Sequence, residues 1–340
     1  MNKEKRIYYS IEEGLKSPKD VQVLFLEKQG LERLPKEFEQ FENLRELDLE
    51  YNNLKEVPEE LKNMKDLVVL ELGGNQISEI PDWFCDLNID TLGFKENNLK
   101  KLPERFGELD LKYLILSENE LVELPDSFIQ LDKVFCMFLD NNCLTQLPEN
   151  FGYLKSFEIN LKNNKLTSLP KSFKFFTGKG LELDNNCFDG FPEVICYLKD
   201  LYLLSIQNCK IKEIPKDFIN CKDIVVLKLG GNNLRTLPDF VGDFFRLEEL
   251  VLEDNQIEAL PISLKKLERL EYIDIGGNNM TKKQLNRKDT GKEFPNPKIV
   301  NTAELMEKAL EYCDNASWDS ELKNMNMVGK DNSGRMTFPY

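Results

Sequence analysis

The residues that most often perform chemistry in proteins are sparse in this chain. Its 340 residues include eight cysteines and no histidine. Histidine is the commonest general base and the commonest metal ligand, so its absence rules out a Ser-His or Cys-His nucleophile pair. No two cysteines have the Cys-x-x-Cys spacing of a zinc site. We therefore expect no catalytic residue, no metal site and no cofactor, and we classify the chain as a non-enzyme.

Two weaker signals of chemistry have plainer explanations. Lys179 stands between Gly178 and Gly180, but the G-x-x-x-x-G-K-[ST] pattern of a phosphate-binding loop is missing. Acidic pairs such as Glu253-Asp254 could act as general acid and base. Carboxylates at water-facing positions usually form a solvated face, however, and neither signal predicts an active site.

A periodic proline pattern shows how the chain positions its side chains. Eleven of the fifteen prolines follow an apolar residue, and successive members lie 22 or 23 residues apart. They are Pro35, Pro58, Pro81, Pro103, Pro125, Pro148, Pro170, Pro192, Pro215, Pro238 and Pro261. A fixed period of this length predicts one short unit that is copied and stacked along the chain, because a single copy cannot bury its apolar face alone.

The stretch before each proline has the pattern L-x-x-L-x-L-x-x-N-x-L, as in Leu44, Leu47, Leu49, Asn52 and Leu54. We count twelve copies, which begin at Val21, Leu44, Leu67, Ile89, Leu111, Val134, Ser156, Gly178, Leu201, Ile224, Leu247 and Leu270. The middle positions alternate like a half-buried strand, and the proline favours an irregular return segment. Return segments are bulkier than strands, so we expect an α/β solenoid, a right-handed horseshoe with a parallel sheet on its concave face.

The pattern resembles the leucine-rich repeat family, in particular the intracellular class with 23-residue Leu-Pro repeats found in scribble-type scaffolds. This resemblance implies a protein-binding scaffold without catalysis, but it does not identify a partner.

An asparagine closes ten of the twelve copies, where its amide can donate to and accept from the backbone of a neighbouring coil. Gln29 and Cys209 occupy this position in the other two copies. Glutamine could replace asparagine at the end of a ladder, whereas a thiol is only a weak donor and acceptor. We expect a local flaw at the ninth repeat, which contains Cys209.

Both ends of the chain depart from the repeat. Ser10-Ile11-Glu12-Glu13 has the spacing of a capping box, so we expect residues 1–20 to form an N-terminal helical cap. Residues 21–290 form the leucine-rich repeat domain in this interpretation. Residues 291–340 would form a C-terminal cap helix, opened by Asn301-Thr302-Ala303-Glu304, and a tail.

The formal net charge of −15 argues against nucleic acid as a partner, because nucleic-acid binding needs clustered Lys and Arg. We see no apolar run long enough to span a bilayer, and the charged start of the chain is unlike a signal peptide. The cysteine spacing favours reduced thiols and a cytoplasmic location. Secretion stays open in case a leader was removed.

Residues between the inward-facing leucines should face the concave groove and contact partners. We expect an apolar cluster in repeats five to seven and a smaller one that includes Val225 and Val251, with acids around them. The predicted partner-binding residues are Tyr113, Ile115, Phe135, Phe138, Phe157, Tyr202, Leu203, Val226, Asp140 and Asp184. Exposed aromatics on a rigid sheet are typical anchors for a protein or peptide, here a basic one. The alternatives are that the C-terminal tail folds back over this face or that two copies of the chain pair through it.

Two further functions were weighed against a binding scaffold. Some bacterial leucine-rich repeat effectors carry a C-terminal ubiquitin-ligase domain with a nucleophilic Cys near an Asp, and Cys313-Asp314 is the candidate here. About fifty residues follow the repeats, which is too short for that domain. The other alternative is a secreted or surface recognition protein.

Overall fold

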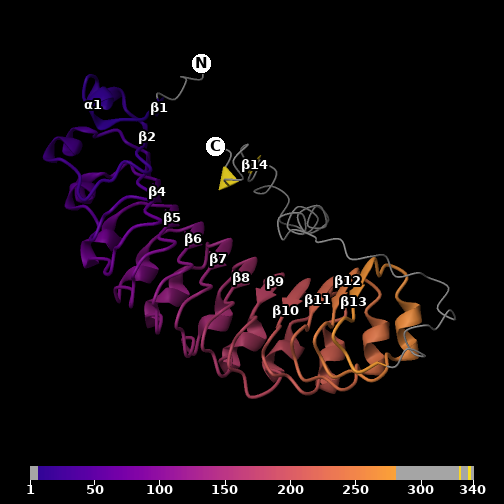
Figure 1. Cartoon of the computed structure of the whole chain (residues 1–340). Helices are drawn as coiled ribbons and strands as arrows, with labels where there is room; N and C mark the ends of the chain where they lie inside the picture. Colours follow the sequence, from indigo (N-terminus) through magenta and orange to yellow (C-terminus); the bar gives the residue numbers. More distant parts are fainter. Residues whose placement is uncertain (1–6, 281–328, 331–335, 338–340) are drawn as a thin grey trace. The chain divides into compact units, whose positions relative to one another are not determined.

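A computed structural model describes residues 7–280, 329–330 and 336–337. The chain divides into two compact units, Met1–Pro295 and Asn296–Tyr340. In the first unit, thirteen parallel strands form one sheet in which each strand pairs with the next in sequence (Figure 1). The strands are β1 (Ile7–Tyr8), β2 (Val23–Phe25), β3 (Glu46–Asp48), β4 (Val69–Glu71), β5 (Thr91–Gly93), β6 (Tyr113–Ile115), β7 (Cys136–Phe138), β8 (Glu158–Asn160), β9 (Gly180–Glu182), β10 (Leu203–Ser205), β11 (Val226–Lys228), β12 (Glu249–Val251) and β13 (Tyr272–Asp274). This is a leucine-rich repeat solenoid, as the sequence predicts.

Short 3-10 helices form the return segments, and in Figure 1 they lie on the side of the coils opposite the strands. Most of them begin directly after the repeat proline, whose fixed φ suits a helix start. They are η2 (Lys36–Gln40), η3 (Glu59–Asn63), η4 (Asp82–Asp86), η5 (Phe106–Glu108), η6 (Asp126–Gln130), η7 (Phe151–Tyr153), η8 (Lys171–Phe175), η9 (Glu193–Tyr197), η10 (Lys216–Asn220), η11 (Asp239–Asp243) and η12 (Ile262–Lys266). No described helix is long and apolar enough to cross a membrane.

One continuous core runs through the coils. The central strand leucines, such as Leu24 and Leu70, are fully buried. From the other side, the apolar residue three positions after each proline fills the coil. Phe128 stacks on Phe106 at 6.2 Å between ring centroids and on Phe151 at 6.1 Å. From η5 to η8 the repeat period therefore produces a column of parallel rings, Phe106, Phe128, Phe151 and Phe173.

The closing asparagines form a buried ladder, as the sequence predicts. Asn142 donates through Nδ2 to the carbonyl of Leu116 in the preceding coil at 2.9 Å and to that of Leu139 at 3.1 Å. Its Oδ1 accepts from the backbone N–H of Leu121 at 3.0 Å. The other nine asparagines make the same set of bonds. Each one satisfies backbone groups at a turn where the sheet ladder has ended.

The ladder is incomplete at the ninth repeat. The Sγ of Cys209 lies 3.3 Å from the carbonyl oxygen of Leu183 and 3.2 Å from that of Gln207, so its single S–H replaces part of the donor function of an asparagine amide. A thiol has no counterpart of Oδ1, and among the described residues no acceptor is found for the N–H of Phe188, the equivalent of Leu121. The same turn contains Gly190 with φ of 132°, a conformation that favours glycine.

The N-terminal end differs from the prediction in two respects. Ile7 and Tyr8 form β1, which pairs with Val23 and Leu24 and adds a thirteenth strand to the twelve expected. The predicted cap helix is a single turn, α1 (Ile11–Gly14), followed by η1 (Pro18–Asp20). Ser10 does cap α1, since its hydroxyl accepts from the N–H of Glu13 at 3.1 Å.

The predicted helix at residues 301–312 lies outside the described residues, as does Cys313. The described part of the second unit is an antiparallel pair, β14 (Gly329–Lys330) and β15 (Met336–Thr337), which the sequence analysis did not predict.

Candidate protein-binding surface

Strand register brings the outward-facing side chains of neighbouring repeats together. Tyr113 is paired with Cys136, and Cys136 with Glu158, so these three residues form one row across β6, β7 and β8. Ile115, Phe138 and Asn160 form the second row. Neighbouring strands lie about 4.8 Å apart, so large side chains in one row touch each other.

The predicted apolar cluster of repeats five to seven is present on these strands. Phe135 and Phe157, each directly before a strand, stack at 4.9 Å with an angle of 10° between the rings. Tyr113 meets Phe135 edge-on at 6.5 Å. Tyr113, Ile115, Phe135, Phe138 and Phe157 are all half-buried, and we call these five residues the aromatic patch.

Two ionisable side chains at the aromatic patch, Tyr113 and Cys136, are held neutral by burial. Burial raises the pKa of Tyr113 to about 12, with smaller contributions from Cys136 and Asp90. Burial also raises the pKa of Cys136 well above its usual value, and this thiol is only 3% exposed. Reactive cysteines need an accessible thiolate. Cys136 therefore acts as a small apolar side chain beneath the patch.

The second predicted apolar cluster is largely closed. Tyr202 and Leu203 are half-buried and contribute accessible surface. Val226 is 1% exposed, and Val225 and Val251 are buried with it. Val226 does occupy an outward strand position, but Leu203 and Glu249 flank it in register and cover it. We remove Val226 from the set of residues that a partner could contact.

The two predicted acids have different environments. Asp140 is half-buried at the edge of the patch, where it accepts from the hydroxyl of Ser117 at 2.6 Å. Asp184 is 5% exposed and accepts from the Ser205 hydroxyl at 2.6 Å and the Gln207 N–H at 2.7 Å. Asp184 therefore holds neighbouring coils together and presents little surface to a partner.

A buried ionisable group next to the patch was missed by the sequence analysis. Lys162 forms ion pairs with Glu182 and, at 3.9 Å, with Asp184. Glu158 is also buried, and its pKa is raised, first by desolvation and then by the charge and hydrogen bond of Glu182. Glu158 stands in the first outward row on β8, and Glu182 stands in the second outward row on the adjacent strand β9. Their positions in the repeat could therefore have indicated that the two carboxyl groups interact.

Acidic side chains gather toward the ends of the sheet. Glu27, Asp48 and Glu50 have carboxylate oxygens within 4.8 Å of one another near β2 and β3. At the other end, burial and the charges of Asp274 and Asp254 raise the pKa of Glu253. The apolar patch thus lies in the middle of a sheet with acidic ends.

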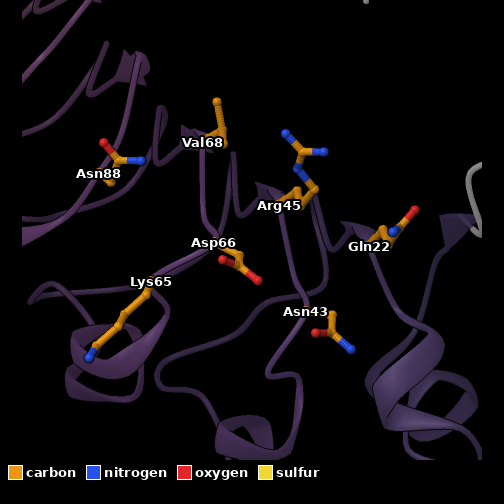
Figure 2. A pocket seen from close by; sticks show the side chains of 7 residues that line it. All are labelled: Gln22, Asn43, Arg45, Lys65, Asp66, Val68 and Asn88. Carbon is orange, nitrogen blue, oxygen red and sulfur yellow. The ribbon is translucent and has the colours of Figure 1, made fainter.

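A shallow hollow lies beside the starts of the first strands (Figure 2). Its lining residues are Gln22, Asn43, Arg45, Lys65, Asp66, Val68 and Asn88. Figure 2 shows Arg45 and Lys65 pointing in opposite directions, with the other side chains spread along neighbouring coils. No set of polar groups converges there as a small-molecule site requires.

Comparisons with known proteins agree with this architecture. The family model described as Leucine rich repeat matches residues 42–99. Chaoptin of Drosophila melanogaster is 33% identical over 79 residues, which are 22% of this chain and 6% of that protein. The chain thus corresponds to a small fraction of that curated relative.

Solved structures match over most of the chain. A Leptospira interrogans leucine-rich repeat protein superposes with a TM-score of 0.66 and 24% identity, covering 83% of this chain and 96% of that one. The plant peptide hormone receptor RGFR1, solved in complex with RGF2, has a TM-score of 0.56 and 21% identity and covers 81% and 54%. These similarities establish the fold.

Proposed function

We propose that this chain is a non-enzymatic interaction module that binds a protein or peptide on the concave face of its sheet, through the aromatic patch. The observation that carries the proposal is the grouping of five half-buried aromatic and aliphatic side chains on three adjacent strands. A water-facing sheet position has no packing reason to be aromatic. Aromatic side chains bury a large area with little loss of conformational freedom, which makes them strong anchors for partners.

The surroundings of the patch support binding more than catalysis. Burial keeps Tyr113 and Cys136 neutral, and Lys162 neutralises Glu182. The neighbouring network therefore offers no free nucleophile. Its role in this proposal is to hold the patch residues at fixed spacing, since a rigid surface loses less entropy on binding.

Charge favours a partner with an apolar centre and basic flanks. The acids of the site itself, Asp140 and Asp184, are hydrogen-bonded within the chain. The acids around β2 and β3 lie four to five strand spacings, or roughly 19–24 Å, from β7. Basic groups flanking an apolar anchor would reach them and increase the rate of association.

The receptor RGFR1 in complex with RGF2 shares the fold. It supports the idea that a leucine-rich repeat solenoid binds a ligand, and it leaves the partner of this chain open. A cytoplasmic location and self-association likewise remain predictions. Cys85, Cys136, Cys143, Cys187, Cys196, Cys209 and Cys221 are free thiols in the structure.

A pull-down tests the proposal. Wild type, Phe138→Glu and Phe245→Glu are each immobilised, and the proteins that they capture are compared. Phe245 lies away from the sheet and is 64% exposed. We expect Phe138→Glu to lose the partners that wild type and Phe245→Glu retain, because a charge in the patch must be desolvated on binding. Circular dichroism melts verify that both variants fold. Identical partner sets for all three proteins would refute the proposal.

A further inference from the structure

A second group of exposed aromatics lies on the helical side of the coils. Tyr153, Phe175 and Tyr197 each end a 3-10 helix, in η7, η8 and η9, five residues after the repeat proline. They are 55%, 50% and 60% exposed. Tyr153 and Phe175 stack at 5.2 Å with 12° between their rings. Most other coils have a polar or charged residue at this position, such as Asp86, Glu108 and Gln130.

Close contact between the coils produces this stacking. A Cβ added to Gly152 would collide with the backbone of Ser172, so only glycine allows η7 to approach η8 this closely. The N–H of Gly152 donates to the hydroxyl of Ser172 at 3.1 Å. The aromatic pair is therefore fixed in place by the backbone beneath it, although much of its surface faces solvent.

The segment that carries Tyr153 and Phe175 has a charge opposite to that of the whole chain. Residues 150–181 contain six lysines and one acid, Glu158, in a chain of net charge −15. Glu158 is buried on the sheet side, as described above. Three of the six lysines, Lys155, Lys171 and Lys174, are exposed near Tyr153 and Phe175 in sequence.

The lysines beside the aromatics have no carboxylate partner among the described residues. Lys155, Lys171 and Lys174 are exposed, and the Nζ of Lys174 lies 4.9 Å from the centroid of the Phe175 ring. Some basic groups elsewhere on the helical side are paired. Lys133 contacts Asp110 at 2.6 Å, and Lys266 contacts Asp243 at 2.9 Å.

We infer that Tyr153, Phe175, Tyr197, Lys155, Lys171 and Lys174 form a second docking surface, which binds an acidic, aromatic-containing segment of a partner protein. Charge complementarity selects the occupant: carboxylates pair with the three lysines, and an aromatic residue packs against the exposed rings. This surface is separate from the aromatic patch on the sheet and has the opposite charge preference, so each can bind or fail without the other.

Fluorescence anisotropy with a labelled random copolymer of glutamate and tyrosine tests the inference on the full chain. We expect Tyr153→Gln/Phe175→Gln to bind at least about tenfold more weakly than wild type, because the variant loses two stacked aromatic anchors. Lys171→Gln/Lys174→Gln should weaken binding about three- to tenfold and reduce its salt dependence. Matched controls are Phe245→Gln for the aromatics and Lys36→Gln/Lys62→Gln for the charges, and both should bind like wild type.

Three results would overturn the inference. The first is equal binding of the copolymer by wild type and by both patch variants. The second is that wild type binds a labelled oligouridylate more tightly than the copolymer and that Tyr153→Gln/Phe175→Gln abolishes this binding. The occupant would then be a single-stranded nucleic acid. The third is dimerisation in sedimentation velocity that the same variant abolishes, since this would make the occupant a second copy of the chain. Phe138→Glu should leave copolymer binding unchanged.

Discussion

Replacing Cys209 with asparagine should repair the buried ladder and stabilise the protein. The new Oδ1 would accept from the N–H of Phe188, as Oδ1 of Asn142 accepts from Leu121 at 3.0 Å. The new Nδ2 would donate to the carbonyls of Leu183 and Gln207, which now receive only the weak thiol donor at 3.3 and 3.2 Å. One net hydrogen bond contributes about 0.5–1.5 kcal/mol, and relieving an unsatisfied buried group adds about 1–3 kcal/mol at most. We expect a gain of about 1–2 kcal/mol, because asparagine is also larger than cysteine and must be accommodated.

Amide hydrogen exchange measures this gain locally, which matters because repeat arrays need not unfold in one step. Protection of the Phe188 amide should rise about tenfold for each 1.4 kcal/mol. The reverse change, Asn142→Cys, should lower the exchange protection of the Leu121 amide by a similar factor. Urea melts of both variants give the global effect. Unchanged or lower protection of Phe188 in Cys209→Asn would refute the explanation, and would mean that the turn at Gly190 has adapted to the thiol.

Two further predictions concern the coils around the two surfaces. Gly152→Ala should destabilise the protein by about 1–3 kcal/mol in urea melts, because the new Cβ meets the backbone of Ser172. Gly276→Ala is the control, since a Cβ there has a side-chain oxygen of Asp274 as its nearest neighbour, at 3.3 Å. Equal losses of stability in the two variants would contradict this reasoning. Glu158→Gln should become progressively more stable relative to wild type as pH rises from 4.5 to about 8. Burial raises the pKa of Glu158 from 4.5 in the unfolded chain to about 8 in the folded protein. Between these values, folding of the wild type must take up a proton or bury a charge, and the free-energy cost grows with pH. A wild-type advantage that grows with pH in melts across this range would show that Glu158 is held as a stable anion.

The repeat period was sufficient to predict the solenoid, because proline, leucine and asparagine at fixed spacing each have one structural role. It could not reveal β1, since Ile7 and Tyr8 stand before the first proline-phased copy and lack its leucines. The capping box located α1 correctly. Its length was overestimated, because α1 ends at Gly14 and a separate 3-10 turn, η1, begins at Pro18.

For the outward-facing residues of the candidate surface, the strand position was predictable and the accessibility was not. Strand alternation identifies outward residues such as Phe138 and Val226 equally well. Their exposure differs because it depends on the size of the side chains at the same row in the adjacent coils. The role of Asp184 depends in the same way on Ser205, one repeat further along. The row of Tyr153, Phe175 and Tyr197 was visible as a repeat phase, but only the structure shows that these rings face solvent.

Hydroxyl-radical footprinting tests the central claim most directly, because the radicals modify accessible aromatic side chains. The partner recovered in the pull-down is added to the wild-type chain, and modification is measured residue by residue. Binding on the concave face predicts protection of Tyr113, Phe135, Phe138 and Phe157 with unchanged modification of Phe245. Protection confined to residues outside the aromatic patch, with these four modified as in the free protein, would contradict it.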